Sequence, residues 1–273
     1  MNEIVVTILG CGSSAGVPRL GGPDNAGDWG KCDPSNPKNY RTRCSVLVER
    51  KSDSGTTRVL VDTSPDLRAQ LLKARVAAVD AVLITHDHAD QIHGFDDLRQ
   101  IAHHTKRRVE VWADGETAKT LQSRFGYCFV QPKGSGYPPI ANLHLIPEPF
   151  APLEIQGAGG PLPVQPFAQT HGAIRSLGFR FGPIAYSPDV NKLDDAAFAA
   201  LDGAEAWIVD ALRHKPHPSH AHVGLALEWL ARVRPRLGVL TNLHQDLDYE
   251  ALKAVLPAGV APAYDGLSVR AEI

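Results

Sequence analysis

The chain has 273 residues, of which 43% are hydrophobic and 21% are charged, and its formal net charge is −2. These values predict a globular protein with a substantial core, and they disfavour a basic nucleic-acid-binding surface. No apolar run approaches the roughly 20 residues of a membrane span. Residues 1–9 lack the features of a leader peptide, and the four cysteines are widely spaced. We therefore expect a cytoplasmic protein with reduced thiols.

The N-terminal part of the chain predicts strands separated by polar turns and one long loop. A first strand, 3–9, runs into the small-residue turn 10–16, and a segment rich in Gly, Pro, Asn and Asp follows at 18–43. A hairpin is predicted from 44–49 and 58–61. Ser64 as N-cap and Pro65 as first helical residue then predict the start of a helix.

The remainder alternates between short apolar runs and amphipathic helices. Strands are predicted at 81–85, 109–112, 143–146, 153–156, 162–170, 175–181, 184–186, 206–209, 237–241 and 267–271. Helices are predicted at 95–104, 116–125, 223–233 and 249–256, and an irregular loop at 126–142. This order predicts an α/β domain spanning residues 1–273, with two sheets and helices outside them.

The densest group of metal-binding residue types follows the apolar strand 81–84. His86, His88 and Asp90 alternate along this segment, and Gln91 and His93 come next. Imidazole and carboxylate are ligands for zinc and for harder divalent cations, and an extended segment can direct alternate side chains to one ion. Further polar residues end later strands: His171, Asp189, Asp210 and His244. Residues at strand ends from distant parts of the chain can converge on one edge of a sheet.

The sequence resembles the metallo-β-lactamase-fold hydrolases along almost its whole length. The features that carry this resemblance are His86-x-His88-x-Asp90 after a strand, a lone His171, Asp189 after Tyr-Ser-Pro, and a late His244. The segments 12–18, 43–45, 62–66, 94–99 and 186–189 are most similar to the phosphoribosyl cyclic phosphodiesterase group of phosphonate degradation. The resemblance implies a four-layer αββα sandwich.

The resemblance also implies a role for each matching residue. His86, His88 and His171 would hold a first metal ion, and Asp189 would bridge to a second one. Asp90 and His244 would complete the second site, and Asp90 is counted with the catalytic residues as well. The implied cofactors are one or two divalent cations, Zn²⁺ or Mn²⁺.

One position departs from the pattern of the family. The usual motif ends in a histidine that binds the second metal, whereas this chain has Gln91 there. A neutral amide oxygen is a poorer ligand than imidazole, so the second site would be weaker. His93 lies two residues further on and is a weak candidate to replace it.

A second histidine cluster precedes the helix predicted at 223–233. It contains His217, His220 and His222. In the resembled group a histidine at this point donates a proton or contacts phosphate. His220 matches that position best and His222 is the alternative, while a solvent-exposed turn remains open.

These patterns predict a metal-dependent hydrolase, and first of all a phosphodiesterase for a small, cyclic or linear, ribose or nucleotide phosphodiester. Two alternatives stay open. One is hydrolysis of a thioester, lactone or other ester on the same metal site. The other is a degenerate, non-catalytic protein that binds a nucleotide or phosphate, which Gln91 would favour. We expect a small phosphate ester as partner, with no membrane and no nucleic acid, although a mononucleotide or a homodimer fits these residues.

Overall fold

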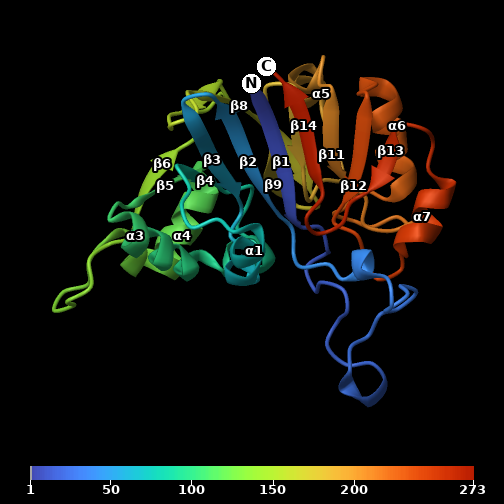
Figure 1. Cartoon of the computed structure of the whole chain (residues 1–273), viewed down its shortest axis with the longest axis horizontal. Coiled ribbons are helices and arrows are strands. Elements are labelled where there is room, and N and C mark those ends of the chain that lie inside the picture. The colour runs from blue at the N-terminus through green and yellow to red at the C-terminus, as the bar shows by residue number, and fades with distance from the viewer. Residues whose placement is uncertain (1) are drawn as a thin grey trace.

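A computed structural model describes residues 2–273. Within them, two β-sheets pack face to face and helices cover both outer faces (Figure 1). Each sheet of the described chain has seven strands. The predicted four-layer αββα sandwich is therefore confirmed, and it brings the ends of distant strands to a common edge.

The first sheet has the spatial order β14-β1-β2-β3-β4-β5-β6. Its strands are β1 (Glu3–Gly10), β2 (Ser45–Ser52), β3 (Gly55–Val61), β4 (Ala81–Leu83), β5 (Val109–Ala113), β6 (Ala141–Leu145) and β14 (Ser268–Glu272). The pairs β3–β4, β4–β5 and β5–β6 are parallel. The carboxyl ends of these strands consequently lie at one edge, where ligands of α/β sheets usually bind.

The second sheet has the order β13-β12-β11-β10-β9-β8-β7. Its strands are β7 (Leu153–Ile155), β8 (Leu162–His171), β9 (Ile174–Phe181), β10 (Ile184–Ser187), β11 (Ala206–Asp210), β12 (Leu237–Thr241) and β13 (Val260–Pro262). Strands β10 to β13 are parallel, so their carboxyl ends also share one edge.

Helices separate into two groups, one for each sheet (Figure 1). They are α1 (Leu67–Ala74), α2 (Ala89–Ile92), α3 (Leu98–Thr105), α4 (Gly115–Phe129), α5 (Asp195–Leu201), α6 (Val223–Val233) and α7 (Tyr249–Val255), with 3₁₀ turns at Pro23–Asn25, Pro37–Asn39 and Phe95–Asp97. Residues of α1, α3 and α4 pack on the first sheet, and residues of α5, α6 and α7 pack on the second.

Strand alternation explains why each sheet is apolar on both faces. In β3, Val59 and Val61 enter the core between the sheets, whereas Leu60 between them faces the helix layer. Successive side chains of a strand point to opposite faces, so a continuous apolar run is needed when both faces are covered. The strands predicted from apolar runs are formed for this reason.

Two helix predictions were wrong in detail, and helix α2 was missed. Helix α4 continues to Phe129, although residues 126–129 were placed in a loop. The Phe125 ring stacks on Phe95 and the Phe129 ring packs against Phe95 at a tilt, which holds the last turn in place. Helix α1 begins after Asp66 rather than after Ser64, whose Oγ instead contacts the Gln70 side chain. Helix α5 was not predicted.

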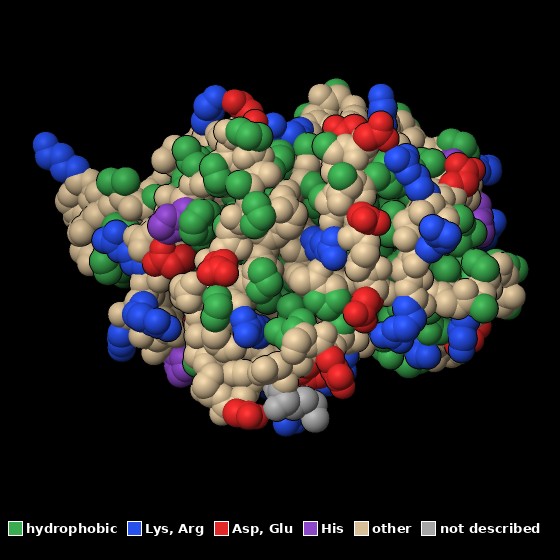
Figure 2. All heavy atoms as spheres, turned by 90° about the horizontal axis from the view of Figure 1, so that it is seen from above, with side chains coloured by type: hydrophobic (Ala, Val, Ile, Leu, Met, Phe, Trp, Pro, Cys, Tyr) green, Lys and Arg blue, Asp and Glu red, His purple; other side chains and the backbone are tan. Residues whose placement is uncertain are grey.

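Three further features concern the membrane-spanning potential of the helices, the surface charge and the cysteines. None of the helices in residues 2–273 combines the length and apolar composition needed to span a bilayer. On the face shown in Figure 2, basic and acidic side chains are intermixed and neither sign dominates. All four cysteines are buried and free.

Candidate metal centre

Three histidine rings meet where β4 and β8 end. His86 and His88 follow β4, and His171 is the last residue of β8. Their ring centroids lie 4.6, 5.1 and 5.0 Å apart, and His171 Nε2 is 3.2 Å from His88 Nδ1. The donor atoms of all three lie within 4.8 Å of one another, which is the convergence that a single metal ion requires.

Hydrogen bonds on the far side of two rings decide which nitrogen faces the centre. Thr85 Oγ1 donates to the Asp62 carboxylate (2.9 Å) and lies 3.0 Å from His86 Nδ1. Because the hydroxyl proton is used on Asp62, His86 Nδ1–H must be the donor to Thr85, which leaves the lone pair on Nε2. His171 Nδ1 likewise donates to the Ser219 carbonyl oxygen (2.6 Å). Both Nε2 lone pairs therefore face the centre.

Burial keeps two of these imidazoles neutral. It lowers the pKa of His86 well below the ordinary value, and it lowers the pKa of His171 to about 4 with help from the charge of His220. His86 Nε2 is buried and has no hydrogen-bond partner in the described chain. A buried polar atom without a partner calls for a ligand. A divalent cation fits this neutral nitrogen set, with Asp189 able to supply an oxygen.

A second group of donors shares His171 and consists of His171, Asp189 and His220. His220 Nδ1 donates to Asp210 Oδ2 (2.8 Å) and lies 3.8 Å from Asp189 Oδ1. Burial alone would lower the pKa of His220, but Asp210, Asp189 and Asp90 together raise it to about 9. Burial raises the pKa of Asp189, which is 2% exposed. A cationic imidazole thus stands beside the candidate metal ligands.

The backbone is left-handed at three polar residues of this centre. Asp62, Asp189 and Asn242 have φ angles of 64°, 48° and 61°. Each follows a strand directly or within two residues. Such angles are uncommon for residues other than glycine and cluster at functional sites.

Asp90 and Gln91 lie on the short helix α2 below the histidines. Gln91 is fully buried, and its Nε2 is 3.3 Å from both Asp90 Oδ2 and Asp189 Oδ2. Asp90 raises the pKa of Asp189, in line with two nearby carboxylates. Asp90 belongs to neither donor group in the described chain, so its metal-binding and catalytic roles stay predictions.

His244 and His222 also lie outside both groups among residues 2–273. His244 Nδ1 is 3.2 Å from Asp246 Oδ2 and accepts from the Asp246 backbone N–H (3.1 Å). His222 is the N-cap of α6, where its Nδ1 accepts from Leu225 N–H (3.2 Å). Metal binding by His244 stays a prediction, and this geometry gives no support to proton donation by His222.

An open hollow of about 600 Å³ borders the centre at His88. His88 lines it together with Asp87, Ala89, His93, Arg124 and Phe125. Arg124 Nη1 donates to the Asp87 carbonyl oxygen (2.9 Å), which holds the guanidinium beside this opening. His93 contacts the Phe125 ring edge to face and is not near enough to join either donor group.

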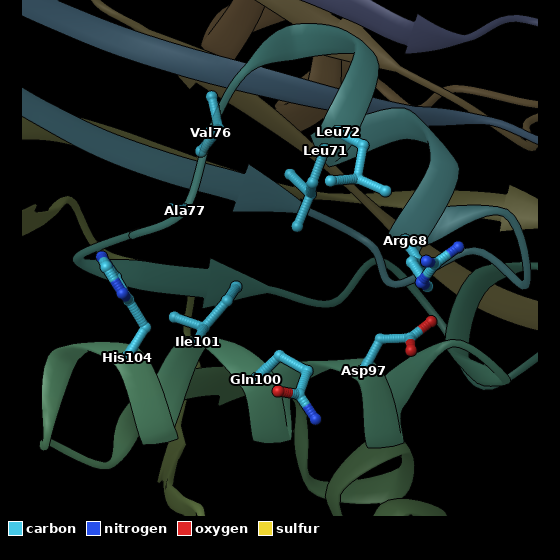
Figure 3. Close-up of a pocket in the computed structure, with 9 residues that line it drawn as sticks. All are labelled: Arg68, Leu71, Leu72, Val76, Ala77, Asp97, Gln100, Ile101 and His104. Atoms are coloured by element: carbon cyan, nitrogen blue, oxygen red, sulfur yellow. The ribbon is translucent and has the colours of Figure 1, made fainter.

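A separate apolar pocket of about 320 Å³ lies between α1 and α3. Figure 3 shows Leu71, Leu72 and Val76 facing Ile101 and His104 across it. It shares no lining residue with the histidine centre.

Sequence reasoning missed the residues that support the ligands. Asp210 was noticed only as a polar strand end, and Asp62 and Thr85 were given no role at the site. Asp62 comes directly after β3 and Asp210 ends β11, so the strand-end position was the available signal. Their partners, His86 and His220, come from other segments and could not be paired without coordinates.

Comparison with known proteins places these features in a family. A family model described as the β-lactamase superfamily domain matches residues 57–242. A crystal structure described as a new diphosphatase from the PhnP family has a TM-score of 0.86 and 31% identity, over 100% of this chain and 99% of that one. A Zn²⁺-bound PqqB from Methylobacterium extorquens has a TM-score of 0.71 at 18% identity, over 97% and 99% of the two chains, which indicates a shared fold.

One curated relative is named as an acyltransferase rather than as a hydrolase. An octanoyltransferase of Porphyromonas gingivalis is 32% identical over 264 residues, which cover 95% of this chain and 50% of that protein. The chain therefore spans about half the length of this relative.

Proposed function

Since the chain belongs to the β-lactamase superfamily and, within this fold of metal-dependent hydrolases, to the PhnP family, we propose that it is a metal-dependent phosphodiesterase. Its substrate would be a small phosphodiester of ribose or a nucleotide, cyclic or linear. The observation that carries this proposal is a histidine–aspartate pair, His220 and Asp210, set beside a three-histidine metal centre.

The centre would hold Zn²⁺ or Mn²⁺ through His86, His88 and His171, with Asp189 as the oxygen ligand. Such a cation supplies Lewis acidity towards a phosphoryl oxygen and acidifies water. The Asp62–Thr85–His86 chain of hydrogen bonds orients one ligand, and the Ser219 carbonyl oxygen orients His171. These outer contacts hold the ring nitrogens in place before substrate arrives.

His220 is suited to protonate the leaving alkoxide. Its Nδ1 is bonded to Asp210, so Nε2 carries the proton that can be transferred. Asp210 is itself held by the Val190 backbone N–H (3.0 Å), and it acts as a positioning residue. Poor leaving groups such as sugar alkoxides need this proton, whereas an activated phenolate does not.

The opening over His88 favours an anionic substrate. Arg124 stands at its rim and offers guanidinium N–H groups beyond the one bonded to the Asp87 carbonyl. Arginine matches the geometry of phosphate oxygens. A hollow of about 600 Å³ admits a nucleotide-sized ligand.

A substrate panel tests the reaction class. We expect the purified, metal-loaded protein to hydrolyse bis(p-nitrophenyl) phosphate and a ribose cyclic phosphodiester. It should lose this activity on chelation and regain it with Zn²⁺ or Mn²⁺. Full activity in the metal-stripped protein would contradict the proposal.

A comparison of leaving groups tests the role of His220. His220→Ala should lower turnover of an alkyl phosphodiester by about 10²–10⁴-fold, the usual contribution of a general acid, and should affect the p-nitrophenyl ester much less. His217→Ala is the matched control, because the His217 ring lies 5.1 Å from that of His220 without bonding Asp210. Equal losses for both esters would show that His220 is not the proton donor.

An acyl substrate is the second candidate, favoured by the relative named octanoyltransferase. An octanoyl thioester therefore belongs in the same panel. A value of kcat/KM for the thioester above that for every phosphodiester would replace our proposal by a thioesterase.

A further inference from the structure

The side chain of Gln91 reaches between two carboxylates. Its Nε2 is 3.3 Å from Asp90 Oδ2 and 3.3 Å from Asp189 Oδ2. A primary amide carries two N–H donors, so one group serves both acceptors. Gln91 is fully buried, and its backbone carbonyl oxygen accepts from Thr63 N–H (2.7 Å), which fixes the residue against the loop after β3.

A buried carboxylate beside a half-buried one needs a compensating partner. Asp189 is 2% exposed, and Asp90 is half-buried. Either a cation or hydrogen-bond donors can compensate buried negative charge. Gln91 provides the donors: its Nε2 contacts one oxygen of each carboxylate, and a cation between Asp90 and Asp189 would need those same oxygens.

The donor groups of the described chain point to a single centre. Both groups of three contain His171, one with His86 and His88 and the other with Asp189 and His220. Asp90, Asp189 and His244 do not form such a group among residues 2–273. A second ion would thus lack assembled ligands and would meet the amide N–H groups.

We infer that this chain binds one divalent cation tightly, at His86, His88, His171 and Asp189, and that the Gln91 amide takes the place of a second cation. The inference rests on the proposed function only in assuming that the centre binds metal. It makes Gln91 the residue that sets the number of ions. The reaction would then depend on one cation together with His220.

Metal stoichiometry tests this directly. The intact protein is loaded with Mn²⁺, desalted, and analysed by elemental analysis and native mass spectrometry. We expect one ion in the wild-type chain and two in Gln91→His, because an imidazole brings a lone pair where the amide presents N–H groups. Electron paramagnetic resonance should show an exchange-coupled pair of ions only in Gln91→His.

Gln100→His is the matched control, since it adds a histidine at an exposed position of α3. It should bind one ion. Two ions in the wild-type chain, no tightly bound ion in it, or one ion in folded Gln91→His would each overturn the inference.

A second variant covers the case in which Gln91→His does not fold. Asp90→Asn should keep one ion bound with unchanged affinity, since Asp90 is bonded to Gln91 and not to the cation. Loss of metal from folded Asp90→Asn would overturn the inference. Ion counting needs no substrate, so one bound ion without phosphodiesterase activity would reject the proposed function and leave this inference standing.

Discussion

Two buried carboxylates, Asp189 and Asp265, look alike until their hydrogen bonds are compared. Both are almost inaccessible, at 2% and 9% exposure, and burial raises the pKa of each. Asp265 Oδ1 accepts from the backbone N–H and the thiol of Cys11, and its Oδ2 accepts from the backbone N–H and the hydroxyl of Thr42. Both carboxylate oxygens of Asp265 therefore have hydrogen-bond donors within the chain.

Asp189 lies among polar groups whose hydrogen-bonding capacity is only partly satisfied. Gln91 reaches it at 3.3 Å, while His171 and His220 remain 4.0 and 3.8 Å away. In the described chain His86 Nε2, Gln91 Oε1 and Asp210 Oδ1 are buried nearby without partners. Burial and a raised pKa thus do not separate a structural carboxylate from one that lies at the candidate metal centre. The completeness of the hydrogen-bond network does.

The largest effect should come from removing a metal ligand. We expect His88→Ala and Asp189→Ala to lose turnover by at least about 100-fold, since even changes to outer-shell partners cost about 10- to 100-fold. The metal-free variants should unfold at the same denaturant concentration as the metal-free wild type or a higher one. Assays of hydrolysis, metal content and urea unfolding check this, and retained turnover would contradict it.

Removing Asp265 should have the opposite effect: it should lower stability and leave metal binding unchanged. Asp265→Ala leaves the backbone N–H groups of Cys11 and Thr42 without acceptors, which should cost about 2–4 kcal/mol of unfolding free energy. The folded fraction should keep its metal. Asp195→Ala is the control, because that side chain is 96% exposed and a surface substitution should change stability by no more than about 0.5 kcal/mol. If Asp265→Ala lost its metal without losing stability, the contrast between Asp265 and Asp189 would be contradicted.

A smaller effect should follow from cutting the support of His86. Thr85→Val removes the hydroxyl between Asp62 and His86, and we expect metal affinity to fall by about 10- to 100-fold. Thr105→Val is matched to it, since the Thr105 hydroxyl bonds only the backbone carbonyl oxygens of Ile101 and Arg107, away from the histidines. Competition with a chelator measures the metal affinity of each variant. Equal affinities for Thr85→Val and Thr105→Val would show that Thr85 does not support the metal ligands.

The smallest effect concerns pH. Because burial raises the pKa of Asp265 above its ordinary value of 3.8, the folded chain holds this proton more firmly than the unfolded chain. Its contribution to stability is complete below that ordinary value and is lost as pH rises through the folded value. The stability difference between wild type and Asp265→Asn should therefore be largest in acid and decrease towards neutrality. Urea unfolding of the metal-free proteins at several pH values measures it, and an increase with pH would contradict the direction.

The apolar runs were enough to predict two sheets with helices outside them, and the resemblance implied the four-layer sandwich. The strand-end pattern drew attention to His86, His88, Asp90, His171, Asp189, Asp210 and His244, of which the structure brings His86, His88, His171 and Asp189 together. Both patterns succeeded because strand alternation and the common edge of parallel strands are local consequences of sequence. The Asp62–Thr85–His86 and Asp210–His220 contacts could not be predicted, since each depends on how separate segments pack.

The predictions of helix ends were wrong for similar reasons. Helix α4 extends past a kink at Phe125 to Phe129 because the rings of Phe125 and Phe129 pack against Phe95, a contact between distant segments. Helix α5 is a different case. Asp194 caps it through the Ala197 N–H (2.8 Å), and this local signal was present in the sequence.

The pairing of β1 with β14 has a practical consequence for joining this chain to other molecules. Ile273 N–H donates to the Asn2 carbonyl oxygen (3.1 Å), and the two chain ends lie side by side in Figure 1. Strand β1 runs in the same direction as β3, away from these ends and towards the histidines. At about 3.3 Å per residue, its eight residues separate the ends from that edge by roughly 25 Å. A tag, a surface tether or a fused enzyme can therefore be attached at either end, or a linker can close the chain into a ring, without blocking the entrance to the metal centre.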